Sequence, residues 1–276
     1  MEIEIELSDL LVKNFSKYAN HIVYERAIPL LNDGLKPVQR RVLLSMNNLG
    51  LNNNKPFKKA AKVIGDTVGQ YHPHSLDGPY GALVNMTATF SARYPLGDGS
   101  GNFGSIENDP PAAMRYVESR LSKTGDLLLG DTNEATVPWM PTYDNEGLEP
   151  KYLGGFFPNI LCNYTNGIAA GVSSMIPSHN ATEVITALIK TIDQVNKGKD
   201  INTKFLMKYI KGPDFPTEGI IMNPDDIQSV YDNGKGKFVI RGQYTIKNKK
   251  ELVFTSIPYT TNAVSYTHLR AHETVL

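Results

Sequence analysis

The spacing of apolar residues predicts a run of helices and turns in the first third of the chain. A helical pattern runs from Ala19 to Leu31 and is followed by the turn-forming triplet Asn32-Asp33-Gly34. Lys36-Pro37 then opens a second predicted helix, from Val38 to Leu49, because proline is favoured at the first helical position. Gly50 ends it.

Two further helices are predicted on either side of a short break. Between Phe57 and Tyr71, apolar residues recur at helical spacing. The break is His72-Pro73-His74-Ser75, and the next helical segment runs from Tyr80 to Phe90, with Ser75 and Pro79 near its start. A helix, a short turn and a second helix form the arrangement in which the second helix enters the major groove of DNA.

The charge distribution supports an anionic partner only locally. The 276 residues include 28 lysines and arginines and 28 aspartates and glutamates, so the chain as a whole has no net charge. Between Asp33 and His74, however, seven basic residues stand against two acidic ones, a balance of +5. The alternative is a solvated basic face without a nucleic-acid partner.

Other compositional features exclude several classes of protein. An apolar fraction of 41% and a charged fraction of 20% are those of a globular chain. A single cysteine, Cys162, excludes an internal disulfide framework. The first residues lack the layout of a signal peptide, and no apolar run reaches the ~18 residues of a membrane span. We therefore expect a cytoplasmic protein with no membrane partner.

One glycine-rich stretch imitates a nucleotide-binding motif. Gly99, Gly101 and Gly104 match the G-x-G-x-x-G spacing of dinucleotide sites. Such a motif should follow a buried strand and open a helix, whereas here two consecutive prolines, Pro110 and Pro111, follow it. We interpret the stretch as a turn that positions the next segment, and a nicotinamide-dependent oxidoreductase remains only a third hypothesis.

The next segment carries a tyrosine beside an arginine. The Tyr116 hydroxyl is a weak nucleophile unless a base, a metal or a cation favours its phenolate, and Arg115 is adjacent. Arginine also stabilises the charge that develops on a phosphate under attack. By themselves these two residues are not specific, and a structural tyrosine packed through its ring is the alternative.

In combination, the motifs resemble the A subunit of type IIA DNA topoisomerases, of the DNA gyrase A or topoisomerase IV A kind and including phage-type forms. The matching blocks keep the family's order from about Phe15 to Asn262. They are Arg26 to Pro29, Asp33 to Arg41, Tyr71 to His74, Asp98 to Ser105, Ala112 to Tyr116, Pro158 to Leu161, Asn166 to Gly171, Ile176 to Asn180 and Gly212 to Thr217.

The resemblance implies an α+β fold and a division of the chain. Residues 1–22 would be an N-terminal arm, 23–150 a winged-helix (helix-turn-helix) DNA-cleavage domain with the catalytic tyrosine, and 151–262 a partial mixed α/β tower domain. Residues 263–276 depart from the family pattern, and we expect them to be a non-native tail. Family members continue into a coiled coil with a dimerising gate, so we expect a breakage-reunion fragment that is inactive alone in strand passage.

The resemblance also implies residue roles. Tyr116 would be the nucleophile of a covalent phosphotyrosine link and Arg115 its neighbouring catalytic arginine. Arg26 would stabilise the transition state, and His72 and His74 would line the cleavage site. The residues implied in DNA binding are Lys36, Arg40, Arg41, Lys59 and Ile168. Ile168 would wedge between base pairs, although from its residue type alone a buried core position is favoured.

The implied activity needs partners. A homodimer supplies one tyrosine for each DNA strand, so that a double-strand break opens and another duplex passes. Mg²⁺ would stabilise developing negative charge, but the basic module has no acidic cluster beside it, and we assign no metal ligand in this chain. A B-type subunit would supply the Mg²⁺ site and ATP binding in an A2B2 complex. The rival hypothesis is a truncated, non-catalytic winged-helix module that binds double-stranded DNA.

Overall fold

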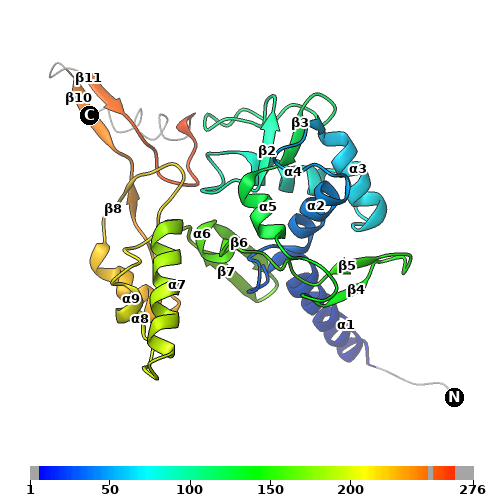
Figure 1. Ribbon diagram of the computed structural model, residues 1–276, viewed down its shortest axis with the longest axis horizontal. Coiled ribbons are helices and arrows are strands. Elements are labelled where there is room, and N and C mark those ends of the chain that lie inside the picture. The colour runs from blue at the N-terminus through cyan, green and yellow to red at the C-terminus, as the bar shows by residue number, and fades with distance from the viewer. Residues whose placement is uncertain (1–5, 248–250, 265–276) are drawn as a thin grey trace.

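The chain combines helices with short antiparallel strands. The computed structural model describes residues 6–247 and 251–264 (Figure 1). The elements of the first part are α1 (Leu7–Ile22), the π-helix η1 (Val23–Ala27), α2 (Pro37–Asn48), β1 (Lys58–Lys59), α3 (Ala60–Gln70), α4 (Asp77–Thr87), β2 (Gly97–Ser100), β3 (Glu118–Leu121), α5 (Lys123–Leu129), β4 (Trp139–Pro141) and β5 (Leu148–Pro150). The architecture is therefore mixed α and β, as predicted.

The N-terminal helix differs from its prediction. α1 begins at Leu7, buries none of its residues and projects away from the body of the molecule (Figure 1). It passes into η1, whose π turn is closed by a hydrogen bond from the Ile28 N–H to the Val23 carbonyl at 3.2 Å. The helix ends there because Pro29 favours an extended conformation at Ile28, which has φ −94° and ψ 130°. The predicted helix from Ala19 to Leu31 was thus wrong at both ends.

The other three predicted helices are present with shifted ends. α2 begins at Pro37, and the Gln39 side chain accepts a hydrogen bond from the Lys36 N–H at 2.9 Å, as in a capping box. α3 begins only at Ala60, because Lys58 and Lys59 pair with β3 instead. α4 begins and ends three residues earlier than predicted.

A three-stranded antiparallel sheet accompanies these helices, in the order β1-β3-β2. Gly97 to Ser100 pair with Leu121 to Glu118, so the glycine-rich stretch supplies an edge strand. A loop follows it, not a helix, which agrees with our interpretation of this stretch as a turn and not a dinucleotide site. Gly99 is required there, because a Cβ would lie 2.4 Å from the Phe103 ring.

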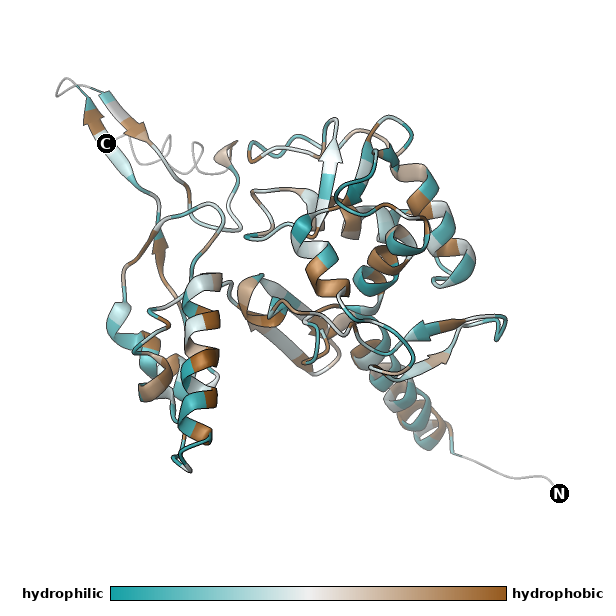
Figure 2. Cartoon of the chain, in the orientation of Figure 1, coloured by the Kyte–Doolittle hydropathy of each residue, from teal (hydrophilic) through white to brown (hydrophobic). Residues whose placement is uncertain are grey.

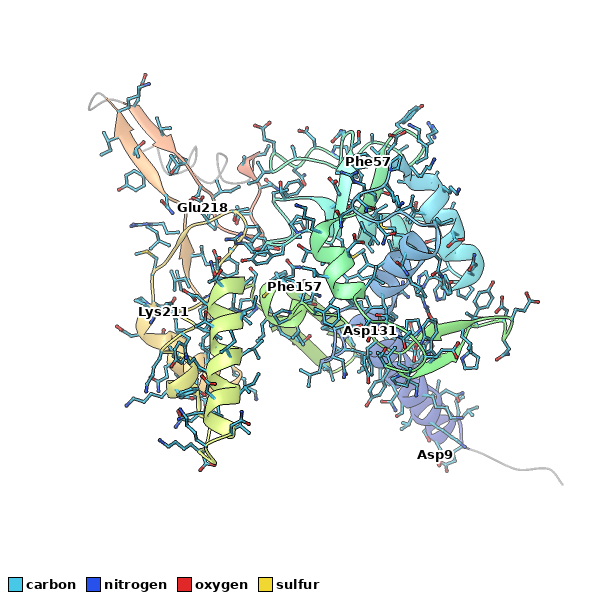
Figure 3. All side chains as sticks on the ribbon, in the orientation of Figure 1. Asp9, Phe57, Asp131, Phe157, Lys211 and Glu218 are labelled. Carbon is cyan, nitrogen blue, oxygen red and sulfur yellow. The ribbon has the colours of Figure 1, made fainter. Side chains whose placement is uncertain are left out.

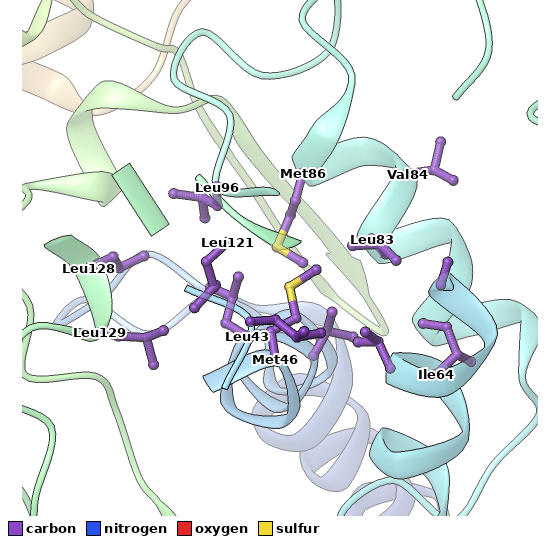
Figure 4. Packing of buried hydrophobic residues seen from close by; sticks show 14 of the residues in the cluster. Leu43, Met46, Ile64, Leu83, Val84, Met86, Leu96, Leu121, Leu128 and Leu129 are labelled. Atoms are coloured by element: carbon purple, nitrogen blue, oxygen red, sulfur yellow. The ribbon is translucent and has the colours of Figure 1, made fainter. Parts of the chain in front are cut away.

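The main core lies between these helices and the sheet. Figure 4 shows its centre, where Leu43 and Met46 of α2 meet Leu83 of α4 and Leu121 of β3. All four are fully buried, and each contributes about 1.5 to 3 kcal/mol relative to an exposed side chain. The cluster also contains Leu128 and Leu129 of α5 and extends as far as Leu153, so one core joins α2, α3, α4, β3 and α5.

The second part of the chain is built from hairpins around a long helix. Its elements are α6 (Asn159–Cys162), β6 (Thr165–Ala169), β7 (Val172–Ile176), α7 (Ala181–Val195), α8 (Thr203–Leu206), β8 (Ile220–Ile221), the 3-10 helix η2 (Pro224–Asp226), α9 (Ile227–Asn233), β9 (Ile240–Arg241), β10 (Tyr244–Lys247) and β11 (Glu251–Phe254). The antiparallel pairs are β6–β7, β8–β9 and β10–β11. Figure 2 shows hydrophobic residues along α7, which buries Val184 and Ala187 and leaves Ile189 and Ile192 more than half exposed.

Two sequence predictions concern membrane spans and the end of the chain. Within residues 6–247 and 251–264, none of the helices is both long and apolar enough to cross a membrane. Of the segment 263–276 that was set apart, residues 265–276 lie outside the described part of the chain.

Candidate functional site

Tyr116 lies on a tight turn just before β3, with its ring in solvent. Its side chain is 64% exposed, whereas the next residue, Val117, is buried in the core. The turn is held by a hydrogen bond from the Tyr116 N–H to the Ala113 carbonyl at 2.9 Å. Burial of Val117 therefore anchors the turn and leaves the phenol facing outward.

Two cations lie beside this tyrosine. The Arg115 guanidinium stacks on the Tyr116 ring, with its Cζ 4.6 Å from the ring centroid. Lys59 Nζ donates a hydrogen bond to the Tyr116 carbonyl at 3.4 Å and forms an ion pair with Glu118 at 3.1 Å. We call Lys59, Arg115 and Tyr116 the tyrosine cluster. Its arrangement offers an accessible phenol with a guanidinium on its ring and an ammonium group at its backbone carbonyl.

The β1-β3-β2 sheet supports the tyrosine cluster through contacts of Arg120. Arg120 of β3 forms an ion pair with Asp98 of β2 at 2.8 Å and stacks on Phe57, whose position Figure 3 labels, with its Cζ 4.1 Å from the ring centroid. These contacts join β2 and β3 to the segment that precedes β1. The strand that follows Tyr116 is thereby held in register.

A second cluster lies at the opposite end of α3. The rings of His72 and His74 pack edge to face, with centroids 4.7 Å apart. Arg41 Nη1 lies 3.2 Å from His72 Nδ1. Burial, followed by the charges of Arg41, His74 and Arg26, lowers the pKa of His72 to about 4. Arg26, Arg41, His72 and His74 thus share one electrostatic environment, which we call the histidine cluster, and His72 is neutral near pH 7.

Sequence reasoning missed one member of this environment. Glu149 of β5 is buried and accepts two hydrogen bonds from Arg41, from Nε and from Nη2, both at 2.7 Å. The two residues are 108 positions apart, and no spacing or motif around Leu148-Glu149-Pro150 indicates the contact. Only the fold of the β4–β5 hairpin against α2 reveals it.

Arg40 does not lie where its predicted role requires. It is 5% exposed, and its Nε and Nη2 donate to both oxygens of Asp33, at 2.7 and 3.0 Å. Nη2 also donates to the Leu35 carbonyl at 3.0 Å, and the Asp33 carboxylate accepts from the Leu153 N–H at 3.0 Å. We therefore correct the prediction that Arg40 holds DNA, because its guanidinium closes the turn before α2 in the interior.

Lys36 borders a small cavity between the two parts of the chain. The cavity, about 210 Å³, is also lined by Asn85 and by Asn166 and Tyr259 from the second part. Burial lowers the pKa of Lys36. A larger cavity of about 600 Å³ lies against the glycine-rich stretch and contains none of the predicted site residues, so we do not assign the chemistry to it.

Ile168 is a surface residue, contrary to what its residue type favours. Its side chain is 80% exposed near the end of the β6–β7 hairpin, where it pairs with Ser173. The preceding Gly167 packs on η1, since a Cβ there would lie 2.4 Å from the Ala27 carbonyl oxygen. The β6–β7 hairpin thus packs against η1, which contains Arg26.

The two clusters do not meet within one chain. Lys59 immediately precedes α3 and His72 lies two residues beyond its end, so the 11-residue helix separates them by roughly 16 Å. Over the described ranges, no hydrogen bond, ion pair or ring contact joins one cluster to the other. Nor do these residues contain a group of three or more His, Cys, Asp or Glu side chains placed to hold a metal ion.

Comparison with known proteins gives a consistent family. Residues 26–272 match the family described as the A subunit of DNA gyrase/topoisomerase IV, so the match extends into the segment 263–276. The chain is 46% identical to the DNA topoisomerase 4 A subunit of Staphylococcus epidermidis over 95% of its own length and 33% of the relative's. It is 44% identical to the DNA gyrase A subunit of Kosmotoga olearia, over 93% and 32% of the two lengths.

A third relative has the same relationship. The DNA topoisomerase 4 A subunit of Staphylococcus aureus is 47% identical over 95% of this chain and 33% of its own length. The chain therefore spans about a third of the length of the curated relatives it matches. With the blocks of sequence named above and a family match over most of its residues, the chain belongs to the family of DNA gyrase and topoisomerase IV A subunits.

Proposed function

We propose that this chain provides the DNA-cleavage and religation chemistry of a type IIA topoisomerase. Tyr116 would attack a phosphodiester and form a covalent phosphotyrosine link, so that a transient double-strand break lets another duplex pass. The observation that carries the proposal is the solvent-exposed Tyr116 side chain, with Arg115 stacked on its ring and Lys59 bound to its backbone carbonyl.

The proposed fold assignment places this chemistry on a DNA-binding surface. Residues 23–150 would form a winged-helix domain in which α3 and α4 are the helix-turn-helix and the loop between β2 and β3 is the wing. Residues 151–262 would form part of a tower domain. Exposed Lys58 and Lys62 near the start of α3 support this assignment, because a docking helix needs cations that reach phosphates.

The proposed step is a transesterification. The Tyr116 oxygen forms a bond to phosphorus as the bond from phosphorus to one deoxyribose oxygen breaks, and that oxygen takes up a proton. Religation reverses both changes, so the energy of the phosphodiester is retained. Arg115 and Arg26 would stabilise the charge on the phosphate, and His74 and the neutral His72 would contact the DNA backbone.

The separation of the two clusters supports a homodimer. A phosphate contact requires groups within about 3 Å, whereas α3 holds the clusters roughly 16 Å apart. We propose that the tyrosine cluster of one copy and the histidine cluster of its partner act on the same phosphate. Two-fold symmetry then gives one such site for each DNA strand.

Mg²⁺ and ATP are assigned to a partner. The described residues offer no group of three or more His, Cys, Asp or Glu side chains that fits a Mg²⁺ ion, so a partner would have to supply the ligands. A B-type subunit would contribute the metal site and ATP hydrolysis in an A2B2 complex. Ile168 fits a further role, because an exposed apolar tip on a hairpin can enter a base step and bend the duplex.

The first prediction concerns Tyr116. With a B-type subunit, Mg²⁺ and end-labelled duplex DNA, the chain should form a covalent protein–DNA adduct after a detergent quench. Tyr116→Phe should abolish that adduct, because the oxygen that bonds to phosphorus is gone, while DNA affinity stays within about twofold.

Tyr143→Phe is a matched control. Its phenol is also exposed, and its hydroxyl donates to the Gly69 carbonyl away from the tyrosine cluster, so its adduct should match wild type. Salt-sensitive DNA binding without an adduct from any variant would favour the rival hypothesis of a non-catalytic DNA-binding module.

A further inference from the structure

Three side chains from three elements form a continuous hydrogen-bonded series that joins Glu149 to two members of the histidine cluster, Arg41 and His72. Glu149 comes from β5, Arg41 from α2, and His72 from the turn after α3. Arg41 is 13% exposed and Glu149 is 5% exposed at the side chain, so both hydrogen bonds of the ion pair are largely screened from water. Such a pair has a fixed geometry, unlike an exposed salt bridge.

The geometry of Arg41 determines the state of His72. Nε and Nη2 are directed at the two oxygens of Glu149, which orients the planar guanidinium and aims Nη1 at His72 Nδ1. Arginine has donors and no acceptor, so Nδ1 must accept and carry no proton. The proton of a neutral His72 therefore lies on Nε2, and His72 presents an N–H donor at its other edge.

We propose that Glu149 is a positioning residue of the cleavage site, which holds Arg41 so that His72 stays neutral and offers Nε2–H to a DNA phosphate. The assignment rests on the proposed function, since it gives His72 a phosphate to contact. Three of the five N–H groups of Arg41 are used in this series, which leaves up to two for the DNA backbone.

The charges around His72 explain why Glu149 matters. Arg41 faces the ring from α2, Arg26 from η1, and His74 from the same turn. Glu149, and Asp66 of α3, act on the adjacent Tyr71. Without Glu149, the Arg41 guanidinium has no fixed carboxylate partner and rotates toward water. Loss of the Glu149 charge alone would lower the pKa of His72, and burial keeps it low in either case, so a rise in that pKa reports that Arg41 has left the ring.

The experiment measures His72 directly and then the reaction. The pKa of His72 is followed by NMR titration of its ring protons in the free chain, for wild type and for Glu149→Gln. We expect a value near 4 in wild type and an increase of at least one unit in the variant. Adduct formation with the B-type subunit should then fall by about half toward pH 5 in Glu149→Gln and stay nearly unchanged there in wild type.

Asp33→Asn is the matched control. It removes the other buried carboxylate–arginine pair of α2, Asp33 with Arg40, and touches neither Arg41 nor His72. It should lower thermal stability and leave the His72 pKa unchanged. Arg41→Lys is a second variant for the case that Glu149→Gln does not fold: one ammonium group cannot reproduce the two-sided contact, so the His72 pKa should also rise.

The outcomes separate this proposal from the proposed function. An unchanged His72 pKa in both Glu149→Gln and Arg41→Lys would overturn the positioning role, as would an equal rise in Asp33→Asn. Rescue of both the low pKa and the pH profile by Glu149→Asp would support it. A raised pKa in Glu149→Gln together with no wild-type adduct at any pH would support the positioning of His72 and contradict the cleavage function.

Discussion

Adjacent arginines of α2 have different environments because a helix turns by about 100° per residue. Arg40 points into the core and is bound by Asp33, whereas Arg41 points toward the β4–β5 hairpin and the histidine cluster. Removing Asp33 would leave a buried guanidinium without its partner, at a cost of about 3 kcal/mol or more. Because both residues are arginines, only the fold shows that Arg40 closes a buried turn and that Arg41 contacts the histidine cluster.

His72 makes folding stability depend on pH. In the unfolded chain its pKa is near 6.5, and in the folded chain it is about 4. Stability is therefore fully present above pH 6.5, falls as the pH drops toward 4 and levels off below, because the unfolded state takes up the proton first. Allowing for partial exposure of the ring, we expect a loss of about 1 to 2 kcal/mol across that window.

The measurement is urea unfolding of wild type and His72→Asn from pH 8 to pH 4. Asparagine keeps an oxygen acceptor near the position of Nδ1 and cannot titrate. As the pH falls, the free energy of unfolding of wild type should therefore decrease by about 1 to 2 kcal/mol more than that of the variant. Burial also lowers the pKa of His179, and that contribution is common to both proteins. A difference that is constant with pH would contradict the assignment.

At the scale of elements, the β6–β7 hairpin depends on a close backbone approach. A Cβ at Gly167 would lie 2.4 Å from the Ala27 oxygen of η1 and 2.9 Å from the Ile28 Cδ1 atom. Because the first of these atoms is backbone, the hairpin or the π-helix has to move if a side chain is added. The position of Ile168 is thus set by the contact of the neighbouring Gly167 with η1.

Gly167→Ala should therefore lower the free energy of unfolding by about 1 to 3 kcal/mol. Gly65→Ala is its control: Gly65 lies within α3 with open space around its Cβ position, so alanine there should raise that free energy by about 0.5 to 1 kcal/mol. Urea denaturation of both variants gives the comparison. Two variants that each match wild type would show that the hairpin does not rest on η1 in solution.

Elements were predictable where local pattern and packing agree. α2 and α3 have apolar faces that meet the core, together with proline or glycine signals near their ends. Their sequence was therefore sufficient to predict both helices. The strands have two to five residues and carry little periodicity of their own, whether they pair across some 60 positions, as β1 does with β3, or in a tight hairpin, as β6 does with β7. The same reason explains why exposed Ile168, in a five-residue strand, resembled a core residue.

At the scale of the molecule, charge is segregated within a neutral chain. The exposed Lys58 and Lys62 flank the start of α3, whereas Lys197 and Lys199 lie in the turn after α7. If the first pair contacts phosphates, replacing both with glutamine should reduce the slope of log affinity against log salt by about 1 to 2. Replacing the second pair should leave the slope unchanged.

Titration of a labelled duplex at several salt concentrations measures these slopes. Equal reductions from both lysine pairs would indicate a diffuse charge effect instead of a binding face on α3. Lys59 is left intact in this test because it also holds the Tyr116 carbonyl and Glu118.

The candidate site was predictable only in part. The resemblance supplied Tyr116, Arg115 and the two histidines by their motifs, and the structure shows Tyr116 exposed and the histidines packed together. Burial of Arg40 and the contact of Glu149 with Arg41 follow from which side of α2 meets which hairpin. Neither is encoded in a local motif, since each depends on residues brought together from distant parts of the chain.

The π turn of η1 sets the direction of α1 independently of the contact between Ala27 and Gly167. α1 buries no residue, so its direction is inherited from the turn that joins it to Ala27. A π turn contains one residue more than an α turn would need, and losing that residue rotates everything before it by about 100° while Ala27 and Gly167 stay in contact. A single-codon deletion in η1 before Arg26 should therefore redirect α1, and Arg26 would keep its place only while Ala27 stays packed on Gly167.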